Sequence, residues 1–185
     1  MGEHQHHEGH GSHTDHVQPS HLTHKTQGVS SLACMVVTCS DSRTPDSDTS
    51  GKLICHLLKR QGHTIAAYRV IKDEPTDIRG LLLQATSQEA LQVVIINGGT
   101  GISRRDSTFE AVDGFLEKKL DGFGEIFRYL SYQDIGSPAI LSRATAGIHG
   151  KLVIFSIPGS QEAVRLAMEQ LILPEIGHIA GELTK

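Results

Sequence analysis

The sequence predicts a three-layer α/β domain, with helices on both faces of a mainly parallel but mixed central sheet, over residues 31–185. Short strand-like runs alternate with segments whose apolar residues recur at helical spacing, as is typical of helices packed on a parallel sheet. Two apolar runs near the C-terminus, residues 141–148 and 152–157, are separated only by His149-Gly150-Lys151. So short a connection favours an antiparallel pair, which makes the expected sheet mixed.

The first part of this region contains three expected strands. Leu32–Cys39 is rich in Val and Met and is expected to be the first strand, and the second is expected at about Thr64–Ile71. Leu91–Ile96 is almost continuously apolar. Such a run is typical of a strand that is buried on both faces, as in the middle of a parallel sheet.

The expected helices are identified by their apolar stripes. Gly62 is expected to end the first of them, since glycine is the usual residue just beyond a helix. Further helices are expected from about Thr108, from Phe123 to Gln133, and after Pro158-Gly159-Ser160. The stripes of the first, second and last helices are Leu53, Ile54, Leu57 and Leu58; Ile78, Leu81, Leu82 and Ala85; and Val164, Met168, Leu171 and Ile172.

Four segments with polar or glycine-rich sequences follow expected strands. They are Ser40-Asp41, Asp73, Gly98–Asp106 and Pro158–Ser160. Right-handed crossovers place the C-terminal ends of parallel strands along one edge of the sheet, where open α/β sheets bind their ligands. We therefore expect the four segments to meet at that edge and to form one site.

Two of these segments are candidate anion-binding loops. The glycines of Gly98-Gly99-Thr100-Gly101 can adopt positive φ angles and bring backbone N–H groups close to an anion. The spacing is neither that of a Walker A loop nor that of a dinucleotide-binding fold. Pro158-Gly159-Ser160 would offer the free N–H groups of a helix start. The alternatives are a tight turn for the first segment and a plain helix start, capped by Ser160, for the second.

The charged residues near these loops favour a metal-bound polyphosphate. Arg104-Arg105-Asp106 follows the glycines, and guanidinium groups bind phosphate while a carboxylate suits Mg²⁺. Asp41, Asp73 and Asp106 are therefore the candidate Mg²⁺ ligands. The alternatives are a solvated charge cluster for residues 104–106 and turn or helix-capping roles for Asp41 and Asp73.

The composition excludes several classes of protein. The net charge of −4 without a basic stripe argues against nucleic-acid binding, and no apolar run is long enough to span a membrane. Three cysteines without C-x-x-C spacing predict reduced thiols in a cytoplasmic protein. Residues 1–30 are rich in histidine and poor in apolar residues, which predicts a disordered tail. This tail is either inert, for example an appended tag, or a weak binder of metal ions.

Short motifs occur in a fixed order over residues 32–180. As a set, they resemble the MoaB/MogA family of molybdenum cofactor biosynthesis proteins, and the first and last of them are closer to MoaB. One difference is Phe109, which stands where the family usually has Pro; with Thr108 as the N-cap, Pro is favoured there but not required. The motifs are Ser40–Arg43, Asp48–Gly51, Ile71–Glu74, Asn97–Gly101, Arg105–Glu110, Gly122–Glu125, Leu130–Tyr132, Leu141–Ala144 and Pro158–Ser160.

The resemblance implies a molybdopterin-binding α/β fold that assembles as a homotrimer or as a hexamer of two trimers. It also implies that the terminal phosphate of molybdopterin attacks the α-phosphorus of Mg-ATP, giving adenylylated molybdopterin and pyrophosphate. The family's essential aspartates correspond to Asp73 and Asp106, and a molybdenum insertase is an implied partner. The substrate-binding residues would then be Ser40, Asp41, Gly98, Gly99, Thr100, Gly101, Arg105, Pro158, Gly159 and Ser160.

Two other functions are compatible with the same residues. A binding or carrier protein would use the pocket to hold molybdopterin and pass it on without chemistry. A metal store would depend on the histidine-rich tail rather than on the pocket. Activity with Mg-ATP separates the enzyme from the carrier, and removal of the tail tests the metal store.

Overall fold

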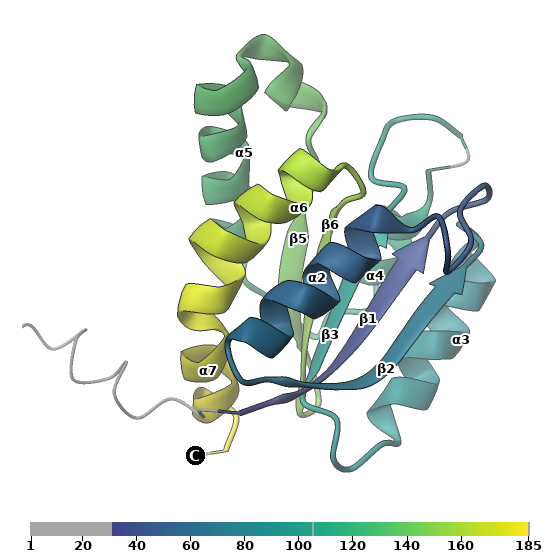
Figure 1. Cartoon of the computed structure of the whole chain (residues 1–185), viewed down its shortest axis with the longest axis vertical. Helices are drawn as coiled ribbons and strands as arrows, with labels where there is room; N and C mark the ends of the chain where they lie inside the picture. The colour runs from purple at the N-terminus through teal and green to yellow at the C-terminus, as the bar shows by residue number, and fades with distance from the viewer. Residues whose placement is uncertain (1–30, 105, 185) are drawn as a thin grey trace, which may run out of the picture.

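The computed structural model describes residues 31–104 and 106–184, which form a six-stranded sheet with the order β2-β1-β3-β6-β5-β4 (Figure 1). β1 pairs in parallel with β2 and β3, and β3 with β6, whereas β5 pairs antiparallel with β6 and β4. The predicted mixed, mainly parallel sheet is thus confirmed. The strands are β1 (Ala33–Cys39), β2 (Thr64–Ile71), β3 (Val93–Gly98), β4 (Lys118–Lys119), β5 (Thr145–His149) and β6 (Leu152–Pro158).

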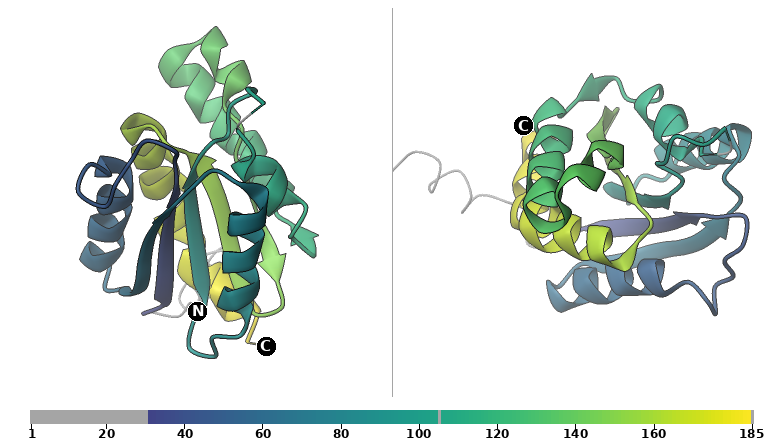
Figure 2. Two further views of the ribbon diagram at one scale, coloured as in Figure 1. Left: turned by 90° about the vertical axis from the view of Figure 1, so that its right-hand side faces the viewer. Right: turned by 90° about the horizontal axis from the view of Figure 1, so that it is seen from above.

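Helices cover both faces of the sheet, which gives the predicted three layers (Figure 2). α2, α5, α6 and α7 pack on one face, and α3 and α4 pack on the other. Between α6 and α7 the helix continues as a π-helical turn, η2, and a 3₁₀ helix, η1, follows α5. The helices are α2 (Thr49–Arg60), α3 (Pro75–Thr86), α4 (Thr108–Asp113), α5 (Asp121–Ile135), η1 (Ser137–Leu141), α6 (Gln161–Ala167), η2 (Met168–Ile172) and α7 (Leu173–Glu182).

The central strands are buried on both faces. In β3, Ile95 belongs to the core under α2 and α6, whereas Ile96 belongs to the core under α3 and α4. Both side chains are fully buried. Because successive strand residues point to opposite faces, a strand in the middle layer needs an uninterrupted apolar run. This requirement explains why the composition of residues 91–96 predicted a doubly covered strand.

The end of α2 confirms the role expected for Gly62. Its φ angle is +83°, in the left-handed region that glycine adopts without a steric cost. The N–H of Gly62 donates to the carbonyl of Lys59, and the N–H of His63 donates to the carbonyl of Leu58. This pair of hydrogen bonds satisfies helix carbonyls that would otherwise lack partners, so the chain turns directly into β2.

One local expectation near the C-terminal half was wrong, and two features there were not anticipated. The strand expected from Leu141 begins only at Thr145, because residues 137–141 form η1, which has Pro138 in its first turn. The short edge strand β4 was not anticipated, since two lysines carry no strand periodicity. The last helix contains a π-turn just before Pro174. Proline has no N–H to donate and its ring crowds the preceding turn, which widens the helix there.

No helix within the described part of the chain is long and apolar enough to cross a membrane. The predicted histidine-rich tail, residues 1–30, lies outside the described residues. Its predicted disorder, and the division between tail and domain, therefore stay predictions.

Candidate functional site

The C-terminal ends of the parallel strands meet at one edge of the sheet and enclose a pocket of about 310 Å³. Cys39 of β1 is aligned with Gly98 of β3, and Gly98 is aligned with Pro158 of β6, so the loops after these strands begin side by side. The register thus brings together segments that are far apart in the sequence. The pocket is lined by Cys39, Ser40, Asp41, Ser42, Arg43, Asp73, Gly98, Gly99, Asp106 and Gly159.

Seven of the residues predicted for the site line this pocket, and the other described ones lie close in the sequence to lining residues. Thr100 and Gly101 continue the glycine loop, and Pro158 is the last residue of β6. The Ser160 hydroxyl accepts a hydrogen bond of 3.1 Å from the N–H of Ala163, so Ser160 caps α6. Arg105 lies outside the described residues. The seven lining residues are Ser40, Asp41, Asp73, Gly98, Gly99, Asp106 and Gly159.

Asp73 is a buried carboxylate that joins the loop after β2 to the start of α4. Its Oδ1 atom accepts hydrogen bonds from the Thr108 hydroxyl at 2.9 Å and the Ser107 hydroxyl at 3.1 Å. The Ser107 N–H donates to the same oxygen at 3.3 Å. These contacts fix the carboxyl plane, and Oδ2 then points at Gly99, where an added Cβ would overlap it. Gly99 is therefore needed for its lack of a side chain.

The structure corrects two capping roles considered for these residues. Glu74, and not Asp73, occupies the N-cap position of α3, and its side chain makes no capping hydrogen bond. Ser107 occupies the N-cap position of α4, so Thr108 is its first residue and not its N-cap. Pro75 and the Asp73 carboxylate explain both shifts: proline is favoured at the first position of a helix, and Asp73 holds the Ser107 and Thr108 hydroxyls.

Asp106 lies at the other side of the glycine loop. Its Oδ2 atom accepts a hydrogen bond of 3.0 Å from the N–H of Ser103, and its own N–H donates to the Ser103 carbonyl. An added Cβ at Gly101 would overlap the same Oδ2 atom. Gly99 and Gly101 thus allow two carboxylates to approach the loop backbone closely. This close approach is a reason for the glycines that the sequence alone did not reveal.

The described carboxylates do not form a preformed metal-binding site. Within residues 31–104 and 106–184, no three Asp, Glu, His or Cys side chains are placed so that they could hold a metal ion together. Asp41, Asp73 and Asp106 nevertheless line the same pocket. An all-oxygen set of this kind suits Mg²⁺, which often keeps its waters and takes one or two carboxylates together with ligand phosphates.

Arg143 holds the glycine loop in place, a role that the sequence did not predict. Its Nε donates to the Thr100 carbonyl at 2.7 Å, and its Nη2 donates to the Gly101 carbonyl. The same guanidinium pairs with Glu110 at 2.5 Å and lies 4.8 Å from the Phe109 ring centre. Phe109 therefore contributes a contact that proline could not make, because a guanidinium stacks favourably on an aromatic face.

A buried network around Asp48 connects the loop after β1 with the loop after β6. Asp48 caps α2 by accepting a hydrogen bond from the N–H of Gly51 at 3.0 Å. Ser50 and Arg43 both donate to the Gly159 carbonyl, at 2.7 Å and 3.0 Å. The only signals for these residues in the sequence were the motifs Ser40–Arg43 and Asp48–Gly51, which assigned them no role. Tertiary contacts alone reveal it.

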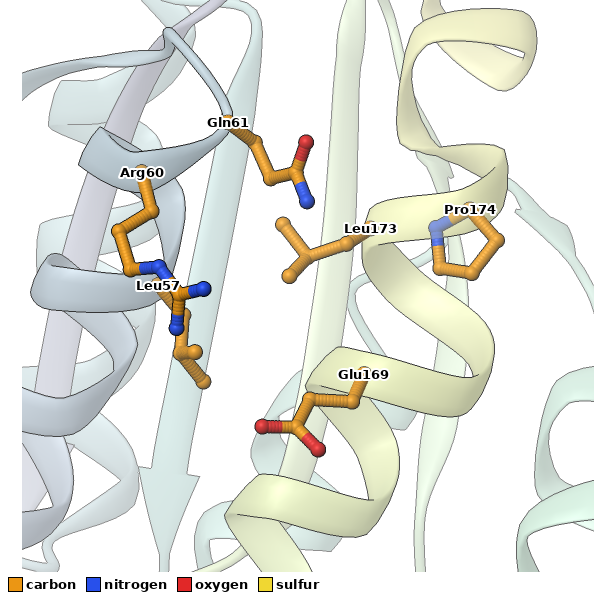
Figure 3. A pocket seen from close by; sticks show the side chains of 6 residues that line it. All are labelled: Leu57, Arg60, Gln61, Glu169, Leu173 and Pro174. Carbon is orange, nitrogen blue, oxygen red and sulfur yellow. The ribbon is translucent and has the colours of Figure 1, made fainter.

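Two other pockets contain none of the predicted site residues. One, of about 340 Å³, lies between the end of α2 and the helix that runs through η2 into α7, where Arg60 and Gln61 face Glu169 and Leu173 (Figure 3). The other, of about 570 Å³, lies between α5 and α6. Both are larger than the pocket at the strand ends. Neither contains an anion-binding loop after a strand, so we place the candidate site at the smaller pocket.

The thiol in the site is not a nucleophile. The pKa of the Cys39 thiol is raised to about 12, mainly by burial; a hydrogen bond with Thr108 lowers it in part, and the nearby Asp73 charge adds to the rise. Only the thiolate is strongly nucleophilic, so Cys39 stays protonated and unreactive at neutral pH. Among the described residues, the pocket is lined by carboxylates, the Arg43 guanidinium and glycine-containing loops. These groups suit binding of a metal-bound phosphate without a covalent protein intermediate.

The chain is similar to proteins of one family. Residues 35–178 match a family described as a probable molybdopterin binding domain. The chain is 52% identical over 161 residues to molybdenum cofactor biosynthesis protein B of Bacillus anthracis, covering 86% of this chain and 95% of the relative. A crystal structure with the same protein name has a TM-score of 0.81 at 51% identity, covering 83% of this chain and 96% of that one.

A more distant structure, the tungsten cofactor synthesizing protein MoaB from Pyrococcus furiosus, has a TM-score of 0.75 at 35% identity. It covers 84% of this chain and 98% of that chain. The similarity therefore extends over the sheet, its helices and the loops that line the pocket. The chain belongs to the MoaB family of molybdopterin-binding domains.

Proposed function

We propose that the protein acts in molybdenum cofactor biosynthesis by transferring the adenylyl group of Mg-ATP to the terminal phosphate of molybdopterin. The observation that carries this proposal is the pocket at the strand ends, where Asp73 and Asp106 meet the loops that contain Gly99 and Gly159. Carboxylates for a hard cation and N–H-rich loops for phosphate are the groups that nucleotidyl transfer needs. The resemblance and the family support the same ligand.

The proposed reaction needs no nucleophile from the protein. A terminal phosphate oxygen of molybdopterin forms a bond to the α-phosphorus of ATP, and the bond from that phosphorus to the bridging oxygen breaks and releases pyrophosphate. Mg²⁺ would neutralise the charge that develops on the leaving pyrophosphate. Asp73 and Asp106 would hold the cation, and the Gly98–Gly101 and Pro158–Ser160 loops would bind the pterin phosphate through their N–H groups.

The proposal gives separate tasks to the supporting residues. Arg143 keeps the carbonyls of Thr100 and Gly101 turned toward itself, so the loop's N–H groups are left to face a ligand. Ser107 and Thr108 keep the Asp73 carboxylate in one orientation. A fixed arrangement of donors and charges lowers the barrier because the site does not have to reorganise during the reaction.

A pyrophosphate-release assay with molybdopterin and Mg-ATP tests the proposal directly. We expect release that depends on both substrates and stops when the metal is chelated. Tight binding of molybdopterin with no pyrophosphate release and no effect of ATP would instead identify a carrier protein. A variant that lacks residues 1–28 should keep full activity; its loss would favour a function of the histidine-rich tail.

We also propose that the protein assembles as a homotrimer, or as a hexamer of two trimers, through an exposed apolar surface on α5 and η1. These elements extend beyond the end of the sheet (Figure 1). Their exposed side chains include Tyr129 at 61%, Tyr132 at 62% and Ile140 at 83%. Contiguous exposed apolar side chains are typical of protein interfaces. A molybdenum insertase is a further proposed partner, with no surface assigned to it.

Replacement of Ile140 by Asp tests this surface. Burying an unpaired carboxylate at an interface is costly, so the variant should have a lower mass in sedimentation or light scattering than the unchanged protein. Ile140 is exposed within the chain, so its own fold should not suffer. Leu83→Asp, at an exposed apolar position on α3, is the matched control. Equal masses for all three proteins would exclude the α5–η1 surface.

The proposed location is the cytoplasm, where ATP is available and thiols are reduced. Cys34, Cys39 and Cys55 are free thiols, as expected in that compartment.

A further inference from the structure

The pocket at the strand ends needs a positive charge if it binds a phosphate. Three aspartates line it, and their combined charge opposes the approach of an anion unless cations compensate. The sequence suggested Arg104 and Arg105 for this purpose. Arg104 is exposed and does not line the pocket, and Arg105 lies outside the described residues. Among the described lining residues, Arg43 has the only positively charged side chain.

Arg43 joins the loop after β1 to the loop after β6, which is one of the two loops proposed to bind the pterin phosphate. Its Nη2 donates to the Gly159 carbonyl at 3.0 Å, and its backbone N–H donates to the Ser40 hydroxyl at 3.2 Å. The side chain is 31% exposed, and Arg43 lines the pocket. A guanidinium has five N–H groups in a fixed fork, and the contacts to Gly159 and Asp48 use only some of them.

Asp48 fixes the position of the Arg43 guanidinium through an ion pair. Its carboxylate is fully buried, and its Oδ1 lies 3.5 Å from the Arg43 Nη1 atom. The other oxygen, Oδ2, accepts hydrogen bonds from the Thr38 hydroxyl at 2.5 Å and the Tyr68 hydroxyl at 2.6 Å. Four contacts from a strand, a helix start, a second strand and Arg43 therefore leave the carboxylate one orientation.

The same contacts keep Asp48 ionised. Burial by itself raises the pKa of the carboxyl group, but the hydrogen bonds from Thr38, Tyr68 and Gly51 and the charge of Arg43 outweigh burial and lower it. Burial and the neighbouring Asp48 raise the pKa of the Tyr68 hydroxyl, so this group remains a donor. A buried carboxylate that stays charged is a firm anchor for a guanidinium.

We propose that Arg43 is the phosphate-binding side chain of this pocket and that Asp48 is its positioning residue. The identity of the phosphate ligand rests on the proposed function, whereas the anion site itself rests on the pocket. A planar guanidinium that is held at one side can present its remaining N–H groups to two oxygens of a phosphate. Lysine would supply the charge without this geometry.

The alternative is that Arg43 only ties down the loop after β6. Ser50 provides a matched control, because its hydroxyl donates to the same Gly159 carbonyl at 2.7 Å but carries no charge. A purely structural role of Arg43 predicts similar effects for Arg43→Gln and Ser50→Ala. A phosphate-binding role predicts a large effect for Arg43→Gln alone.

Titration of the full-length protein with inorganic pyrophosphate tests the proposal. Loss of a charged hydrogen-bond donor is expected to weaken binding about tenfold or more in Arg43→Gln, with partial rescue in Arg43→Lys. Ser50→Ala should stay within about threefold, since a neutral hydrogen bond contributes less. Equal affinity of the unchanged protein and Arg43→Gln, or equal losses in Arg43→Gln and Ser50→Ala, would overturn the role of Arg43.

A double-mutant cycle tests the role of Asp48. If Asp48 acts through Arg43, Asp48→Asn weakens pyrophosphate binding in the unchanged protein but causes no further loss in Arg43→Gln. Independent, additive losses would overturn the positioning role. Thermal unfolding of each variant identifies any that fail to fold, and Arg43→Gln, which leaves Asp48's three hydrogen bonds in place, keeps the anion site testable.

The outcome is separable from that of the proposed function. Arg43-dependent binding of pyrophosphate without pyrophosphate release from ATP and molybdopterin would reject the transfer reaction and keep the anion site. Release of pyrophosphate at an unchanged rate and substrate affinity in Arg43→Gln would keep the reaction and reject the anion site. If the unchanged protein binds no pyrophosphate, the proposed anion site is rejected, whatever the result of the enzyme assay.

Discussion

Replacement of Asp106 by Asn is expected to reduce pyrophosphate release by about a hundredfold or more while the protein stays folded and binds molybdopterin. The change removes a negative charge proposed to hold Mg²⁺ beside the reacting phosphates. It keeps an oxygen that can accept the hydrogen bond from the N–H of Ser103, now 3.0 Å long. The loss should therefore appear in turnover at saturating substrate rather than in the melting temperature.

Asp134→Asn is the control for this substitution, since Asp134 is an exposed carboxylate on α5 and does not line the strand-end pocket. It should leave turnover unchanged. The measurements are pyrophosphate release at saturating Mg-ATP, isothermal titration with molybdopterin, and thermal unfolding. Unchanged turnover in Asp106→Asn would reject a catalytic role for this carboxylate.

A single methyl group at Gly99 is expected to damage the site almost as strongly. The added Cβ in Gly99→Ala would overlap Oδ2 of Asp73, so either the loop or the carboxylate must move. The carboxylate cannot move freely, because Ser107 and Thr108 hold its other oxygen. Displacement of a catalytic group by about 1 Å can lower turnover by about a hundredfold, and overpacking costs about 1–3 kcal/mol of stability.

Gly80→Ala is the matched control for the glycine substitution. Gly80 lies inside α3, and a Cβ built there meets nothing within 4 Å. Alanine is the better helix former, so Gly80→Ala should raise the free energy of unfolding by about 0.5–1 kcal/mol and leave activity unchanged. Chemical denaturation and the pyrophosphate assay measure both effects. Full activity of Gly99→Ala would mean that the close approach to Asp73 has no function.

The succession of the main strands and helices along the chain could be predicted because each element depends on a pattern within a few residues. The continuous apolar run at Leu91–Ile96 reflects a strand that is buried on both faces, and the apolar stripe on α2 reflects a helix that is buried on one face. The start of β5 could not be predicted in this way. Leu141 looked like part of a strand, yet it is 52% exposed at the end of η1. Exposed apolar residues have the local pattern of buried ones, and only packing distinguishes them.

The candidate site was predictable in position but not in its internal contacts. Parallel strands and right-handed crossovers place Asp73, Gly99 and Gly159 at one edge, and the structure brings all of them to one pocket. Which atoms meet was not predictable. Arg143 holds the glycine loop through hydrogen bonds to its carbonyls. Among the described residues, Arg43 lines the pocket, whereas Arg104, the cation expected from the sequence, does not. These contacts join residues up to 116 positions apart, so no local pattern can indicate them.

The layered α/β architecture, the edge at which the loops gather and the family can all be read from the amino-acid sequence, since each follows from local periodicity or from an ordered set of motifs. The need for glycine at positions 99 and 101, and the burial and charge of Asp48, became visible only in the folded chain. This difference arises because the role of a carboxylate depends on the groups that surround it. Hydrogen bonds and a guanidinium that come from distant strands and loops determine whether it is held in place, ionised and directed at the pocket.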